Sequence, residues 1–177
     1  MRTHFDFLEQ PEMDTSVGLF YAMVEENVDR LHHLIEDVTE EELYYKGSDG
    51  DENSMAQLLN HLTYVDVRWV FRIKGEALPD SLEAEHGPMV DKDGKLPVVT
   101  SLSVQELIEK QRYVLALLKE TCQALHDDDL ARWIPYEEER QATIRWGLWH
   151  MADHHRYHQA HINRLRLSYA KGEMGSL

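Results

Sequence analysis

The chain of 177 residues is 42% hydrophobic and 29% charged, a composition that predicts one globular domain, residues 1–177, with a substantial core. Its formal net charge of −15 would repel a phosphate backbone or an anionic lipid surface, so we expect no nucleic-acid and no membrane partner. The single cysteine, Cys122, rules out an internal disulfide and a cysteine-rich metal site, and its hydrophobic neighbours predict that it is buried.

Four segments place hydrophobic residues at i, i+3, i+4 and i+7, the spacing of amphipathic helices. They run from about Thr15 to Val38, from Ser54 to Lys74, from Ser103 to Leu125 and from Thr143 to Lys171. Ser54 is a predicted N-cap. One predicted capping box begins at Thr39 and opens a single short turn, and a second begins at Ser103. Four amphipathic helices in one chain predict an all-α fold, a four-helix bundle.

The segments between the helices carry weaker signals. Leu96–Thr100 is the only short β-like run, and its proline argues against a central strand. The connection from Gly75 to Leu102 is roughly twice the ~12–15 residues above which unstructured loops become uncommon, so it either covers a site or is a plain surface insertion. The N-terminal residues Met1–Phe7 have no basic region followed by an apolar run, and we therefore expect a cytoplasmic protein.

Histidines are concentrated near the C-terminus, where five of the eleven lie between Trp149 and His161. This stretch has no glycine or proline and reads as helix, so His154 and His158 lie one turn apart on one face and can hold one metal ion. A third ligand must come from another helix, and His61 lies on the apolar side of the second one. Packed helices approach to about 8–10 Å, so these three histidines are predicted to form a metal site with open positions.

The alternative is a solvated histidine-rich face, or imidazoles hydrogen-bonded to their neighbours in the bundle. His150 and His161 share the inward face, and their roles stay open. Each is either a neighbour that orients a metal-binding histidine, a polar residue of the core, or a residue at the rim of the site. His155 points about 100° away from His154 and is expected to be exposed. His86, in the long connection, is weighed as a residue near the site but is expected to be structural. The same is expected of His4, His32, His33 and His126.

Other catalytic chemistries have little support in the sequence. The nine glycines are scattered and form no phosphate-binding loop, and there is no G-x-S-x-G motif. Cys122 has no basic neighbour that would activate it as a nucleophile. No Glu-x-x-His repeat of the di-iron bundles occurs in the second or the fourth helix. Catalytic residues are therefore not assigned, and no further cofactor-binding residue is predicted.

Two segments resemble the motifs of the DinB/YfiT-like superfamily, and the resemblance covers nearly the whole chain in helix order. Asn53–Leu62, followed by Trp69, is similar to its second-helix motif, in which a serine begins the helix and a histidine lies seven residues later. His150–Ile162 is similar to its fourth-helix H-x-x-x-H motif. The second histidine of that motif is usually followed by Arg-Gly-Gln, whereas this chain has Gln159–His161 there.

The resemblance implies an up-down-down-up bundle, often a homodimer, with a divalent metal on His61, His154 and His158. Characterised relatives include S-transferases that use mycothiol, bacillithiol or glutathione, and a maleylpyruvate isomerase. Three imidazoles suit zinc, nickel and iron about equally. A homodimer is also expected because Trp69, Trp146, Leu148 and Trp149 are more hydrophobic residues than one side of a small bundle needs.

Three functional hypotheses follow. In the first, the metal activates a low-molecular-weight thiol or a water molecule toward a small-molecule substrate, as in an S-transferase or a hydrolase. The acidic surface offers no evident basic pocket for an anionic thiol, which argues mildly against this hypothesis. The alternative is a non-catalytic metal-binding or stress-related bundle. A coordination position of the metal that no protein group fills would favour the enzyme over this alternative. The third is an interaction bundle without metal.

Overall fold

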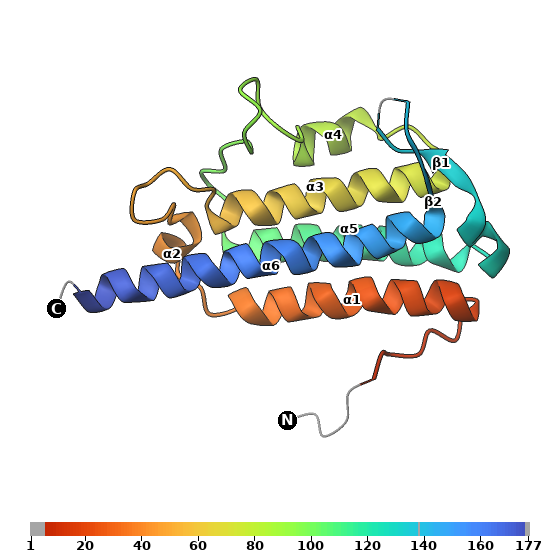
Figure 1. Ribbon diagram of the computed structural model, residues 1–177, viewed down its shortest axis with the longest axis horizontal. Helices are drawn as coiled ribbons and strands as arrows, with labels where there is room; N and C mark the ends of the chain where they lie inside the picture. Colours follow the sequence, from red (N-terminus) through yellow and green to blue (C-terminus); the bar gives the residue numbers. More distant parts are fainter. Residues whose placement is uncertain (1–5, 138, 176–177) are drawn as a thin grey trace.

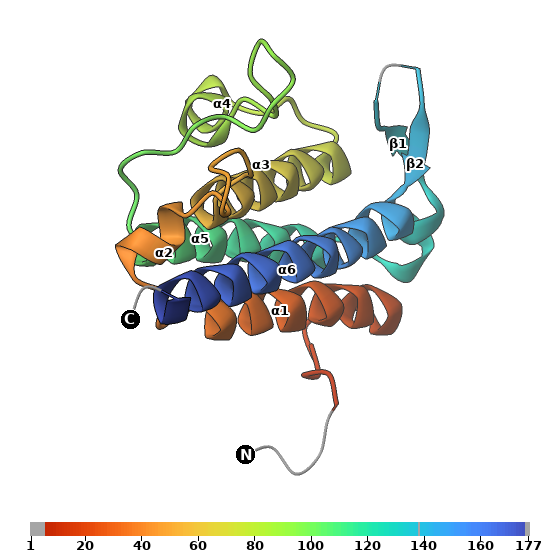
Figure 2. The same cartoon turned by 60° about the vertical axis from the view of Figure 1, so that its left-hand side comes forward.

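The computed structural model describes residues 6–137 and 139–175, and most of these residues are helical. The elements are α1 (Thr15–Ile35), α2 (Glu40–Tyr44), α3 (Met55–Lys74), α4 (Asp80–His86), α5 (Val104–Gln123), a 3₁₀ turn η1 (Asp127–Ala131), β1 (Trp133–Pro135), β2 (Gln141–Thr143) and α6 (Ile144–Gly175). Figure 1 and Figure 2 show the four long helices α1, α3, α5 and α6 side by side. The predicted all-α class and the four predicted helices are confirmed. No helix in the described part of the chain is long and apolar enough to cross a membrane.

The helix starts follow from the predicted caps. Ser54 and Ser103 each accept a hydrogen bond from the backbone three residues later, and the side chain at that position bonds back to the cap, so both ends are complete capping boxes. Thr39 likewise accepts a hydrogen bond from the backbone N–H of Glu42 and starts α2. The Glu42 carboxylate does not close the box, because it accepts a hydrogen bond from Arg166 of α6 instead. This bond ties the short helix α2 to the bundle.

Two hydrophobic clusters fill the space between the long helices. The cluster nearer the β-hairpin contains Val17, Tyr21, Trp69, Leu118, Cys122 and Leu148 among others. The cluster nearer α2 contains Leu31, Leu59, Leu62, Leu107 and Ile162 among others. The prediction that Cys122 is buried is confirmed. Along both α3 and α6, the predicted metal ligands occur at the boundary where one cluster gives way to the other.

The connections between the long helices differ from the prediction. Leu96–Thr100 is not a strand; the strands are β1 and β2, which form an antiparallel hairpin with Ile134 opposite Ala142. Each strand has only three residues, too few for an alternating pattern to be recognised in the sequence. The long connection from Gly75 to Leu102 contains α4, so it is partly structured where the sequence predicted only loop.

The hydrophobic residues that motivated the homodimer prediction divide into two kinds. Trp69 and Leu148 are fully buried in the core of the bundle, so the expectation that they add to a surface patch is wrong. Trp146 and Trp149 are exposed by 36% and 47%. Only these two tryptophans still support a contact with a second copy, and the homodimer stays a prediction.

A glycine allows α3 to pack directly on the backbone of α6. A Cβ atom built on Gly147 would lie 2.6 Å from Cζ3 of Trp69, far inside ordinary van der Waals contact. The bulky indole of α3 therefore packs directly on the backbone of α6, where no side chain separates the two helices. Because α6 carries two of the three predicted ligands, this contact helps to set how near they come to α3.

We predict that Gly147→Ala lowers the free energy of unfolding by about 1–3 kcal/mol, because the added methyl group overpacks the site occupied by Trp69. Gly172→Ala is the matched control on the same helix, since a Cβ there meets nothing within 4 Å. Alanine favours a helix over glycine, so the control should gain up to about 1 kcal/mol. Urea unfolding followed by circular dichroism measures both changes. Equal or greater stability of Gly147→Ala than of the wild type would contradict this account of the α3–α6 contact.

Candidate metal centre

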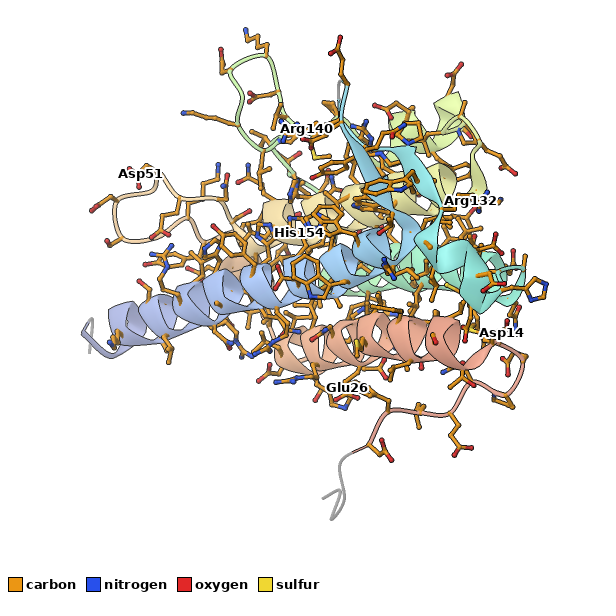
Figure 3. The ribbon with its side chains drawn as sticks, turned by 45° about the vertical axis from the view of Figure 1, so that its right-hand side comes forward. Asp14, Glu26, Asp51, Arg132, Arg140 and His154 are labelled. Atoms are coloured by element: carbon orange, nitrogen blue, oxygen red, sulfur yellow. The ribbon has the colours of Figure 1, made fainter. Side chains whose placement is uncertain are left out.

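The three predicted ligands meet in the structure. His61 comes from α3, and His154 and His158 come from successive turns of α6; the nearest ligand atoms of the three lie within 4.8 Å of one another. The Nε2 atoms of His154 and His158 are 3.0 Å apart. The ring centroid of His61 lies 5.2 Å from each of the other two. Figure 3 labels His154 on the side of α6 that faces α3.

All three imidazoles are held neutral. His158 is 7% exposed, and His61 and His154 are half-buried. Burial, followed by the neighbouring imidazoles, lowers the pKa of His154 to about 2 and that of His158 to about 3. Burial also lowers the pKa of His61, partly offset by the carboxylate of Asp66. A neutral imidazole is the form that binds a metal ion, so the cluster has the protonation state that a ligand set requires.

The donor set fits a divalent cation. Two nitrogens held about 2.0–2.1 Å from one tetrahedral ion lie roughly 3.3 Å apart, close to the spacing of His154 and His158. The Nδ1 atoms of His61, His154 and His158 are buried and have no hydrogen-bond partner among the described residues. The nitrogens of His154 and His158 that face each other are the Nε2 atoms, so these are the atoms that an ion would contact. The three histidines can hold a metal ion.

His150 and His161 flank the cluster without joining it. His150 stacks on His154 at 5.4 Å and on Trp146 at 4.9 Å, so it continues a row of rings along α6 toward the hairpin. His161 lies on the other side, 5.6 Å from His158 and 4.5 Å from Tyr157. Among the described residues, the group that can share an ion contains only His61, His154 and His158. His150 and His161 are therefore neighbours of the candidate site, one on each side.

The prediction that His155 is exposed is wrong. His155 is fully buried, and its Nε2–H donates a hydrogen bond of 2.6 Å to Oδ2 of Asp66 on α3. The reason is that α6 is buried on two sides, against α1 as well as α3. A heptad stripe of Leu148, Met151, His155, His158, Ile162 and Leu165 is the signal that would have placed His155 in the core. The buried Asp66–His155 pair, one residue from the predicted ligand His154, is thus a feature that the sequence analysis missed.

The long connection does reach the site. Its helix α4 packs on α3, where Asn60 donates a hydrogen bond of 3.2 Å to the backbone carbonyl of His86. A little further on, the backbone of Met89 interacts with the imidazole of His61. His86 is itself fully buried, with neither ring nitrogen hydrogen-bonded among the described residues. The segment therefore covers one side of His61, which favours a site-lining role over a plain surface insertion.

Two of the histidines expected to be structural agree with that expectation. His32 of α1 is 8% exposed, and its Nε2 lies 3.0 Å from Oε1 of Gln111 on α5. His126 is exposed and lies beside Asp14. His4 falls outside the described residues.

A mostly helical protein with three neutral histidines that can hold a divalent ion is the class that the fold and the site define. The family model of the DinB superfamily matches residues 23–162, a range that contains His61, His154 and His158. The chain belongs to the DinB superfamily. It is also 47% identical over 156 residues to the uncharacterized protein YkkA of Bacillus subtilis (strain 168), covering 88% of this chain and 89% of that protein. This likeness supports the family and gives no reaction.

In the metal-free protein, we predict that stability falls between about pH 7.5 and about pH 5. Imidazoles titrate near ~6.5 in the unfolded chain, whereas His154 and His158 stay neutral in the folded protein, with a pKa of about 2 and about 3. Below about pH 6.5 the unfolded state therefore binds more protons, and the loss grows as the pH falls toward the folded pKa values. We expect about 1–2 kcal/mol per histidine at pH 5.

Urea unfolding in the presence of a chelator measures this loss. His154→Gln should lose less stability between the two pH values, because glutamine does not titrate. The control His33→Gln changes an exposed histidine of α1 and should keep the wild-type loss. A wild-type loss retained in His154→Gln would contradict the prediction.

Proposed function

We propose that this protein is a metal-dependent enzyme, an S-transferase or a hydrolase, in which His61, His154 and His158 hold one divalent ion such as zinc, nickel or iron. The observation that carries the proposal is a cluster of three neutral imidazoles with no fourth histidine, cysteine or carboxylate joining it among the described residues. Sites with three protein ligands keep a position open for water or substrate, and such sites are catalytic more often than structural.

A bound divalent cation lowers the pKa of a thiol or water that reaches it, and so supplies the nucleophile at neutral pH. The chain's own contribution is to bind, orient and shield. The three histidines stay unprotonated at neutral pH, so protons do not compete for their nitrogens. No protein thiol takes the role of nucleophile, because Cys122 is fully buried and burial raises its pKa to about 12. This supports a reaction in which a small thiol or water attacks.

The alternative is a non-catalytic metal-binding or stress-related bundle. The same three histidines serve this function equally well, and the family relationship is compatible with both. The open position decides between them, since a metal whose coordination is completed by protein groups has no site for a reacting molecule.

We also propose the finer topology and the assembly that the resemblance implies. The chain colours in Figure 1 support an up-down-down-up bundle, since α1 and α6 run one way while α3 and α5 run the other. A single domain over residues 1–177, a cytoplasmic location, a homodimer and a small-molecule substrate stay predictions. The exposed Trp146 and Trp149 support the dimer.

The metal assignment predicts that His158→Ala loses most of its bound metal, because two imidazoles hold a divalent ion much more weakly than three. Elemental analysis of tag-free protein gives the metal content per chain. His33→Ala is the matched control and should keep the wild-type content, since His33 is an exposed histidine on α1. Full occupancy in His158→Ala would remove the basis of the proposed function.

The enzyme assignment predicts turnover that depends on the metal. We would load the protein with zinc, nickel or iron and assay it with several low-molecular-weight thiols and electrophiles, and with ester substrates. Turnover should disappear on chelation and in His158→Ala, and return when metal is restored to the wild type. Fully metal-loaded protein that turns over none of these substrates would favour the non-catalytic alternative.

A further inference from the structure

Two arginines, Arg68 and Arg72, lie on the same side of α3 as His61, nearer the end of the helix that faces the hairpin. They follow His61 by seven and eleven residues, which places them roughly 10 and 16 Å further along the helix axis. Both side chains are half-buried. Arginines one turn apart repel each other, and Arg68 indeed lowers the pKa of Arg72, after the larger effect of burial. This pair is unfavourable for the fold unless something compensates for it.

Aromatic rings, rather than carboxylates, surround these arginines. The guanidinium of Arg72 lies 5.0 Å from the ring centroid of Trp69 and 5.3 Å from that of Tyr136. The guanidinium of Arg68 lies 5.7 Å from the ring of Tyr64. Among the described residues neither arginine forms an ion pair, although the chain has 33 acidic against 18 basic residues.

Two described carboxylates in this region, those of Glu137 and Glu83, have other partners. Glu137 is close enough to act on Arg72 electrostatically, but its Oε2 lies 3.9 Å from Nη2 of Arg140. Glu83 accepts a hydrogen bond of 2.7 Å from the hydroxyl of Tyr64. Arg68 also donates a hydrogen bond to the hydroxyl of Tyr64. The guanidinium of Arg72 is stacked on rings by its faces, which leaves the N–H donors in its plane available. A strong anion-binding group is therefore present without a described protein anion to bind.

Rings join this pair of arginines to the metal centre. Arg72 acts electrostatically on His150, which lies 5.7 Å from Trp69 and 6.3 Å from Tyr136. His150 in turn stacks on the predicted ligand His154. Tyr136, His150 and His154 are all only half-buried, so this surface is partly open to solvent. Figure 3 shows the hairpin that carries Tyr136 and the labelled Arg140 rising beside the part of α6 that carries His154.

We infer that Arg72, supported by Arg68, binds the carboxylate of a small aromatic acid, whose ring lies against Tyr136 and beside the edge of His150 and whose far end points toward the histidine cluster. A guanidinium matches a carboxylate with two parallel N–H···O bonds, and ring surfaces favour a flat ligand over a puckered one. The rings of Tyr136 and His150 link Arg72 to His154: Tyr136 lies 5.3 Å from the Arg72 guanidinium and 6.3 Å from His150, which lies 5.4 Å from His154. The role of this acid as a substrate rests on the proposed function.

Under this inference, the acidic chain would offer one basic site for a carboxylate. The same carboxylate chemistry also occurs on low-molecular-weight thiols, whose acids are aliphatic. An aromatic acid fits better than an aliphatic one, because the guanidinium of Arg72 lies against the rings of Trp69 and Tyr136. The two sources are distinguishable by the shape of the ligand.

The test is a binding panel on the full-length protein, with its metal content measured in the same samples. Benzoate, cyclohexanecarboxylate, benzamide and glutathione would be titrated by calorimetry into wild-type protein, Arg72→Gln and the control Arg112→Gln, which changes an exposed arginine of α5. We expect benzoate to bind wild type more tightly than cyclohexanecarboxylate or benzamide. Arg72→Gln should weaken benzoate by about tenfold or more, the usual cost of losing a charged hydrogen bond, with its metal content unchanged.

Several outcomes would overturn the inference and leave the proposed metal site standing. The first is equal affinity for cyclohexanecarboxylate and benzoate. The second is unchanged benzoate affinity in Arg72→Gln, which would place the carboxylate on the metal. The third is a loss of affinity in Arg72→Gln for glutathione alone. Wild-type protein that binds benzoate but no metal would instead overturn only the proposed function. If Arg72→Gln fails to fold, Arg68→Gln and the wild-type panel test the same claim.

Discussion

The packing of α6 on two sides at once is the constraint on which the candidate site depends. Its face toward α3 closes tightly because Gly147 lets Trp69 reach the helix backbone. Its other face is covered by α1, so the helix has almost no freedom to rotate about its axis. With α6 fixed in this way, His154 and His158 point at His61, and a rotation of one residue would replace them with Tyr157 or His155.

Buried polar pairs hold the same helices in register. Asp66 and His155 join α3 to α6 within the core, and His32 and Gln111 join α1 to α5. Buried polar groups are costly unless they find their partners, so a shifted register would leave these side chains unpaired. The pairs therefore favour one alignment of the four helices over its neighbours, and that alignment is the one that assembles the histidine cluster.

Family membership does not by itself fix the reaction. The match to the DinB superfamily covers residues 23–162, and one such scaffold with three histidines can serve many reactions. The surroundings of the histidines are the segment with α4 and Met89 beside His61, and the row of rings from His150 to Tyr136 with Arg72 next to it. These groups limit which molecules can approach the histidines, so they would determine a preference for one substrate over another.

The sequence by itself determined the four long helices, their caps and the three histidines, because helix periodicity and i, i+4 spacing are local properties of the chain. It did not determine which side of α6 faces solvent, and His155 was misplaced because two-sided burial depends on how the helices assemble. The hairpin was missed because strands of three residues have no recognisable period. The site beyond the ligands, including Asp66, Met89 and Arg72, was decided only by the tertiary structure, since contacts between α3, α6 and the connecting segments join residues far apart in the chain.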